Sequence, residues 1–166
     1  MAIRSFNHLA YRCLDASATV DFYVNVIGLP FAWATVADIV GSTGARDPHI
    51  HIFFALPDNT YLAFFELLDR PPPQKDPNTP DWVQHISFTV DGMDDLLAAK
   101  ARLEARGIKV LGPKLGKRFN SIYFFDPNGH RLEYTYLAAS MGAAEAAEAQ
   151  TELAKWNRRK AAQAAE

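Results

Sequence analysis

An internal repeat constrains the fold of this chain more than any other feature. The segment His8-Leu-Ala-Tyr-Arg in the first half matches His85-Ile-Ser-Phe-Thr in the second half in its alternation of side chains. In both halves an acidic residue, a helical pattern and a glycine follow. Each half then ends in a β-hairpin pattern whose outgoing strand carries a glutamate, Glu66 or Glu133. Two units of about 75 residues each, built to one plan, predict two similar modules paired about a pseudo-twofold axis.

Each module is predicted to have the element order β-α-β-β-β. In the first half, we expect strands over residues 6–14, 31–40, 50–56 and 61–68, with a helix between Asp15 and Gly28. In the second half, we expect strands over residues 83–90, 108–111, 121–125 and 131–137, with a helix over 93–106. The predicted organisation is therefore module 1 over residues 1–68, a proline-rich linker over 69–81, module 2 over 82–137 and an Ala-rich C-terminal tail over 138–166.

Composition narrows the function classes. Hydrophobic residues make up 49% of the 166 positions, which is enough for a sizeable core. A formal net charge of −2 offers no electrostatic basis for binding nucleic acid. The single cysteine, Cys13, excludes an internal disulfide and a cysteine-based zinc site. No apolar run is long enough for a membrane helix and no signal peptide is visible, so we expect a soluble, cytoplasmic protein.

The C-terminal tail is rich in Ala, Glu, Lys and Arg, which favour helix, but it has few large apolar residues. We expect a mostly solvated helix. The alternative is a helix that straps onto the body of the protein or onto a second subunit through Leu153 and Trp156.

Glu133 needs a partner. The segment Asp126-Pro127-Asn128-Gly129 predicts a tight turn between two strands, and Glu133 falls in the middle of the outgoing strand between Leu132 and Tyr134. A carboxylate buried there without a partner would cost several kcal/mol. The repeat offers three candidates for the group that stabilises it: His8, Glu66 and His85.

Two histidines and two glutamates at matching places in the repeat predict a metal site formed by His8, Glu66, His85 and Glu133. Imidazole and carboxylate ligands suit one divalent ion such as Zn, Ni, Mn, Co or Fe(II). Small residues two positions after each histidine would leave room for a ligand. A lone histidine on a strand is more often a hydrogen-bonded core residue. The pair His49 and His51 has no counterpart in the second half, so we interpret it as polar lining or surface.

These four residues, the Asp-Pro-x-Gly turn before Glu133 and the β-α-β-β-β modules resemble the vicinal oxygen chelate superfamily. That superfamily includes glyoxalase I, fosfomycin- and bleomycin-resistance proteins, methylmalonyl-CoA epimerase and extradiol dioxygenases. The resemblance covers residues 4–137. It implies an α+β fold in which two paired βαβββ modules form a half-open, cup-shaped sheet around one metal ion. It also implies a small-molecule substrate and a homodimer.

The resemblance leaves three functions open. In glyoxalase-like isomerases and lyases, which we favour, all four residues hold the metal, two adjacent substrate oxygens bind it, and Glu133 or Glu66 acts as the base. An extradiol dioxygenase would hold Fe(II) with His8, His85 and Glu133, but residues 114–117 lack the histidine of that signature. A bleomycin-resistance-like protein would sequester its ligand without catalysis.

The resemblance also suggests substrate contacts. Arg12 matches a glyoxalase position that binds a carboxylate, and Ser121 and Tyr123 resemble phosphonate contacts of fosfomycin-resistance proteins. We expect Tyr123 to contribute to catalysis as well as to binding.

Overall fold

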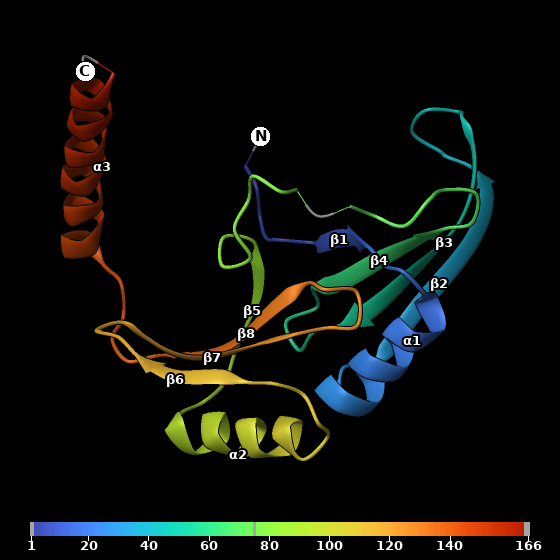
Figure 1. The fold of residues 1–166 in the computed structure, drawn as a ribbon, viewed down its shortest axis with the longest axis horizontal. Coiled ribbons are helices and arrows are strands. Elements are labelled where there is room, and N and C mark those ends of the chain that lie inside the picture. Colours follow the sequence, from blue (N-terminus) through green and yellow to red (C-terminus); the bar gives the residue numbers. More distant parts are fainter. Residues whose placement is uncertain (1, 75, 165–166) are drawn as a thin grey trace.

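The computed structural model describes residues 2–74 and 76–164, and these form two mixed four-stranded sheets with three helical regions (Figure 1). The first sheet has the order β1-β4-β3-β2, formed by β1 (His8–Arg12), β2 (Phe31–Ile39), β3 (Arg46–Ala55) and β4 (Tyr61–Leu67). The second has the order β5-β8-β7-β6, formed by β5 (His85–Thr89), β6 (Leu111–Leu115), β7 (Phe119–Phe125) and β8 (Arg131–Leu137). The repeated α+β architecture predicted from the sequence is confirmed.

The two sheets have the same pairing. In each, the first strand of the module pairs in parallel with the last, and the remaining strands are antiparallel. A strand that returns parallel to the first needs a crossover, and the helix after the first strand provides part of it. The helix of module 1 is α1 (Ala16–Asp21), which continues as the π-helix η1 (Phe22–Ile27). The helix of module 2 is α2 (Met93–Glu104).

Local signals fix the ends of the first helix. The Asp15 side chain accepts a hydrogen bond of 2.8 Å from the Ala18 amide, as an N-cap residue does. Gly28 ends η1 at φ 93°, a left-handed conformation that glycine adopts without steric cost. The expected strand over residues 108–111 is wrong. The Ile108 amide still bonds to the carbonyl of Leu103, and pairing with β7 begins only at Leu111, so the strand is β6.

The hydrophobic core lies between each sheet and its helix. In module 1, Tyr23 and Phe22 of η1 pack with the buried face of β3 and β4, and in module 2 Leu96 and Leu103 of α2 are fully buried. Alternate residues on every strand therefore face away from the helices. This second face of each sheet, which we call the open face, carries the candidate site residues other than Glu66.

The turn between β7 and β8 joins the two modules. Asn128 Oδ1 accepts a hydrogen bond of 2.9 Å from the Leu14 amide. The ring Nε2 of His130 lies 2.9 Å from the carbonyl oxygen of Arg12, and this ring also packs on Tyr11 and Phe64. The predicted turn therefore has a second role as the contact between the halves.

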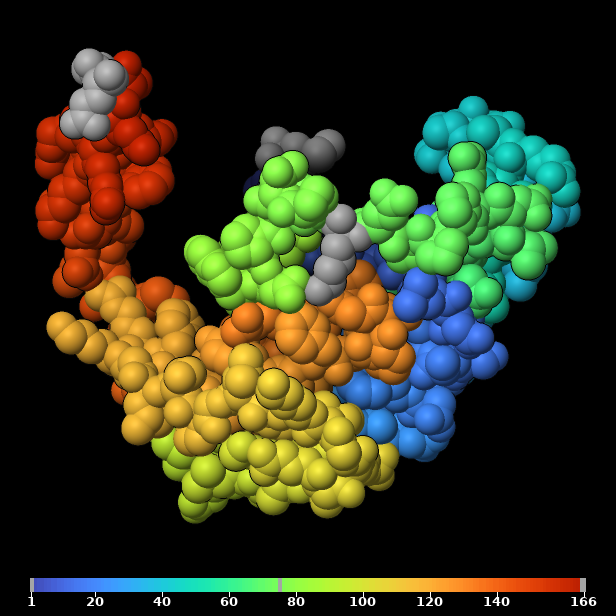
Figure 2. Space-filling model, viewed as in Figure 1, coloured from blue at the N-terminus to red at the C-terminus, as the bar shows by residue number. Residues whose placement is uncertain are grey.

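The linker between β4 and β5 crosses above the sheets, and the C-terminal helix α3 (Ala143–Gln163) stands away from the body (Figures 1 and 2). Arg12 donates a hydrogen bond of 2.6 Å to the carbonyl of Pro71 and so holds the start of the linker. No described residue of α3 is buried, as expected for a solvated helix. Among the helices described, none combines the length and the apolar character needed to cross a membrane.

Candidate functional site

The register of module 2 places His85 and Glu133 on the open face. In the parallel pair β5–β8, His85 aligns with Arg131 and Ser87 aligns with Glu133. His85 Nε2 lies 3.1 Å from Glu133 Oε2. The Glu133 side chain is only 9% exposed, whereas the His85 side chain is 34% exposed. The structure therefore brings two of the four predicted metal ligands into direct contact.

The protonation of His85 decides what this contact can do. Its Nδ1 lies 3.3 Å from the carbonyl oxygen of Val83, which accepts a hydrogen bond from the ring when Nδ1 carries a hydrogen. In the imidazolium form, Nε2 donates to Glu133. In the neutral tautomer whose hydrogen is on Nδ1, Nε2 and the carboxylate oxygen direct lone pairs toward the same space, which a cation between them would stabilise.

Tyr123 and Arg131 flank this pair. Tyr123 is the β7 partner of Glu133, and burial, followed by its hydrogen bond to Glu133, raises the pKa of the Tyr123 hydroxyl. The guanidinium carbon of Arg131 lies 4.3 Å from the centroid of the Tyr123 ring. Within the described chain, Arg131 Nε is buried without a hydrogen-bond partner. A phenol donor and a cation therefore stand next to the carboxylate.

Ser121 lies further along the same face, but its hydroxyl is engaged. It donates a hydrogen bond of 2.8 Å to Thr135 Oγ1, and that hydroxyl donates to the carbonyl of Asn120 at 3.2 Å. Ser121 is 2% exposed. It therefore stabilises the floor of the site, and contact with a substrate would require this bond to rearrange.

Glu66 lies on the opposite face of its sheet. In the parallel pair β1–β4, His8 aligns with Tyr61, so Ala63 and Phe65 share the open face with His8. Glu66 falls between the open-face positions, and its Oε2 accepts a hydrogen bond of 2.6 Å from the Ala16 amide at the start of α1. The structure thus separates Glu66 from His8, contrary to the arrangement expected from the sequence.

His8 and His51 come together on the open face of module 1. Their ring centroids are 6.3 Å apart. His8 Nδ1 lies 2.6 Å from Asn7 Oδ1, so Nε2 is the ring atom available to a ligand. His51 stacks on Phe65 with 3.6 Å between ring centroids. Burial, aided by His8 and His49, lowers the pKa of His51 to about 4, so the ring is neutral at pH 7.

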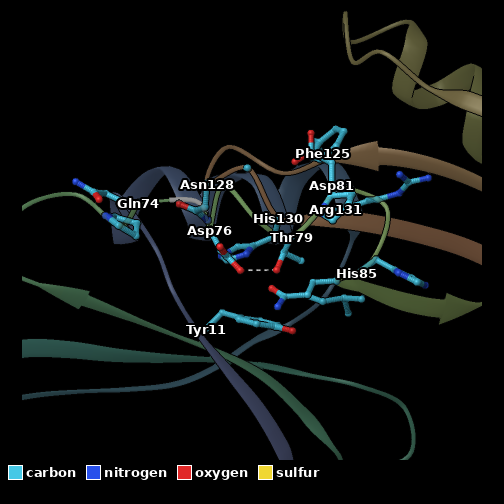
Figure 3. A pocket seen from close by; sticks show the side chains of 15 residues that line it. Tyr11, Gln74, Asp76, Thr79, Asp81, His85, Phe125, Asn128, His130 and Arg131 are labelled. Atoms are coloured by element: carbon cyan, nitrogen blue, oxygen red, sulfur yellow. Dashed lines mark hydrogen bonds between the residues drawn. The ribbon is translucent and has the colours of Figure 1, made fainter. Parts of the chain in front are cut away.

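Arg12 is also on the open face, but the linker backbone occupies it through the Pro71 carbonyl. Its Nε is buried and without a hydrogen-bond partner among the described residues. A cavity of about 290 Å³ lies under the linker, and Figure 3 shows His85 and Arg131 in its wall together with linker residues such as Asp76 and Thr79. The linker therefore covers one approach to His85.

The donor atoms of the candidate site suit a divalent cation. Imidazole nitrogen and carboxylate oxygen are ligands for Zn, Ni, Mn, Co and Fe(II). Over residues 2–74 and 76–164, however, no three His, Cys, Asp or Glu side chains of one chain lie close enough to hold an ion. The donors form two pairs instead, His8 with His51 and His85 with Glu133.

Two residues of the site escape prediction from the sequence. Arg131 lies two residues before Glu133 on β8, so the alternation of the strand places both on the same face. This spacing predicts a cation next to the carboxylate, but no local pattern gives Arg131 a function. The sequence indicates only a polar lining or surface position for His51, because no residue of the second half corresponds to it. Only the packing across three strands brings it to His8.

Comparison with known proteins identifies the family. The model of the Glyoxalase/Bleomycin resistance protein/Dioxygenase superfamily matches residues 5–134. The 2-epi-5-epi-valiolone epimerase of Actinomyces sp is 30% identical over 150 residues, which cover 80% of this chain and 79% of that protein. The ethylmalonyl-CoA/methylmalonyl-CoA epimerase of Cereibacter sphaeroides is 27% identical over 131 residues, which cover 75% of this chain and 90% of that protein.

A solved structure shares the fold. A mutant of the genomically encoded fosfomycin resistance protein FosX from Listeria monocytogenes, complexed with Mn(II) and 1S,2S-dihydroxypropylphosphonic acid, has a TM-score of 0.57 and 17% identity. The match covers 84% of this chain and 96% of that chain. The family model spans nearly all of both modules and ends before the C-terminal tail. The chain therefore belongs to the Glyoxalase/Bleomycin resistance protein/Dioxygenase superfamily.

Proposed function

We propose that the protein is a divalent-metal-dependent isomerase that moves a proton on a small substrate with two adjacent oxygen atoms. The observation that carries this proposal is the contact of 3.1 Å between His85 Nε2 and Glu133 Oε2 on the open face of module 2. Two relatives that are named as epimerases support it. Epimerisation removes a proton from a carbon and returns it on the other side, which requires a carboxylate or a similar base.

His8, His85 and Glu133 would hold the ion. Glu66 is left out of this ligand set because its carboxylate caps α1 on the opposite face. When bound, the ion would supply positive charge that stabilises the negative charge developing on the substrate.

The chain's own side chains account for the proton transfer. A carboxylate has two oxygens, so Glu133 can remain beside His85 through Oε2 while Oε1 accepts a proton from the substrate. The Tyr123 hydroxyl, kept neutral by burial, which raises its pKa, donates a hydrogen bond that orients the substrate or the carboxylate. The guanidinium of Arg131 would attract an anionic group on the substrate.

The two donor pairs must meet for an ion to bind, because protein sites for these metals need three or more ligands. We place this meeting in a homodimer, where module 1 of one protomer faces module 2 of its partner. A mixing experiment tests the arrangement. His8→Ala and Glu133→Ala variants, each inactive alone, should regain activity when they are unfolded together and refolded, because one of the two sites in the mixed dimer is intact.

The function itself is tested by proton exchange. The protein is loaded with Mn, Co, Ni or Zn and incubated in D₂O with 2-hydroxyketones, with 2-epi-5-epi-valiolone and with methylmalonyl-CoA. Proton NMR should show loss of the signal of the hydrogen on the exchanging carbon, because deuterium replaces it. Glu133→Gln should abolish this exchange, and Ser121→Ala should only slow it. Metal binding without exchange on any of these compounds would contradict the isomerase proposal. Bound iron with oxygen uptake on catechol would favour the dioxygenase instead.

A ligand-sequestering function is the second candidate. Aromatic rings line the open face of module 1, where Phe53 packs on Trp33 and Tyr61 as well as on both histidines. Such a shelf suits a flat apolar ligand held without chemistry. This second function would be supported if the protein binds none of the metals and an aromatic ligand quenches its tryptophan fluorescence.

A further inference from the structure

The position of module 1 that corresponds to Glu133 is occupied by Ala63. In module 2, Glu133 pairs with Ser87, two residues after His85. In module 1, Ala63 pairs with Ala10, two residues after His8. The repeat therefore has a carboxylate in one half and a methyl group in the other, at the same place in the sheet.

His51 reaches the space next to this alanine. On β3 the residue directly opposite Ala63 is Phe53, and His51 is two residues away, at the diagonal position on the same face. Ala10 and Ala63 are both small and leave room for the two imidazoles, whose centroids lie 6.3 Å apart.

The Nε2 atom of His51 is buried and has no hydrogen-bond partner among the described residues. A buried polar atom left unpaired in this way is unfavourable, because it has lost its hydrogen bonds with water and gained none in return. Packing on Phe65 and Phe53 does not explain a histidine here, because an apolar ring would make these two contacts without that cost. The neighbouring His49 differs, since its Nδ1 lies 2.7 Å from the carbonyl oxygen of Asp47.

We propose that His51 is a metal ligand, which takes the role that a carboxylate at position 63 would have. The inference rests on the proposed metal-dependent function and specifies its ligand set as His8, His51, His85 and Glu133. Three imidazoles and one carboxylate give the bound ion one more net positive charge than two imidazoles and two carboxylates. The site would accordingly favour nitrogen-preferring ions such as Zn, Co and Ni over Mn.

The test is metal affinity, measured by titration calorimetry with Co(II) and Zn(II) on the full chain. His51→Gln should weaken binding by more than about 100-fold, because loss of an outer-shell partner alone costs about 10–100-fold. His49→Gln, two residues away on the same face, should leave affinity unchanged. The visible spectrum of bound Co(II) should change in His51→Gln and not in His49→Gln. Adding Ala63→Glu to His51→Gln should restore binding, with circular dichroism confirming that each variant is folded.

The outcomes separate the two proposals. Wild-type affinity in His51→Gln, together with lost binding in Glu133→Gln, overturns the role of His51 and leaves the metal-dependent function standing. No binding of any metal by the wild-type protein overturns both. Weakened binding that Ala63→Glu restores supports both.

Discussion

Tyr23 and Asp126 join the two modules through a buried hydrogen bond. The Tyr23 hydroxyl donates to Asp126 Oδ2 at 3.1 Å, across a junction between η1 and the β7–β8 turn. Burial, followed by the nearby Asp126 carboxylate, raises the pKa of Tyr23 well above its ordinary value, so the hydroxyl remains a donor. Asp126 Oδ1 accepts from the amides of Asn128 and His130, and the carboxylate therefore organises the turn as well as the junction.

Tyr23→Phe should lower the free energy of unfolding by about 1–3 kcal/mol, because the variant leaves one buried oxygen of a charged group with fewer donors. Urea denaturation followed by circular dichroism measures the change. Tyr61→Phe is the control, since Tyr61 lies on the open face and its ring contact with Phe53 would persist. Equal stability of the two variants would show that the Tyr23 hydroxyl does not hold the modules together.

Glu66→Ala should cost stability and spare metal binding. The variant removes a charged acceptor from the Ala16 amide at the first turn of α1, and such a bond contributes about 1.5–3 kcal/mol. Urea denaturation gives the loss of stability, and calorimetric titration with Zn(II) gives the affinity. Asp15→Ala, which removes the N-cap of the same helix, is the matched control. Lost metal affinity with unchanged stability would instead make Glu66 a ligand.

The fold could be predicted because its signals are local. The alternation of the strands, the cap at Asp15, the glycine at position 28 and the turn after Phe125 each act within a few residues. The repeat then supplied the architecture, since two modules of one pattern have few ways to pair. The strand expected over residues 108–111 begins only at Leu111. Before that point Ile108 is still hydrogen-bonded to Leu103 of α2 and Val110 packs in the core, so neither residue pairs with β7.

The site was harder to predict because it depends on register. Matching the two halves by their hairpin glutamates equates Glu66 with Glu133, but the parallel pairing of the first and last strands equates Ala63 with Glu133. The difference is three residues, an odd number, and therefore moves a side chain to the opposite face. The pairing of β1 with β4 joins segments far apart along the chain, so no local pattern specifies it. The same holds for the approach of His51 to His8.

Cys13 should be chemically inert in the folded protein. Its side chain is buried, and this burial raises the pKa of the thiol to about 11. At pH 8 only about 0.1% of the thiol would be thiolate, the form that reacts. Iodoacetamide labelling measured by mass spectrometry should be slow at pH 8 and become rapid in urea at the same pH. Rapid labelling of the native protein would mean that the segment directly after β1 opens readily.

The C-terminal helix should be dispensable for the fold of a single chain. Two ion pairs connect α3 to the body: Glu145 and Glu148 each lie next to Arg118, in the bend between β6 and β7. All three side chains are partly or largely exposed, and such pairs are worth about 0–1 kcal/mol. Deleting residues 142–166 should therefore leave the free energy of unfolding almost unchanged, while the helical signal in circular dichroism falls. Leu153 and Trp156 are 54% and 55% exposed, so the helix has apolar surface left for a second copy. Sedimentation velocity separates the two cases: an unchanged oligomer shows that α3 is solvated, and dissociation together with a large loss of stability would show that it packs on the partner.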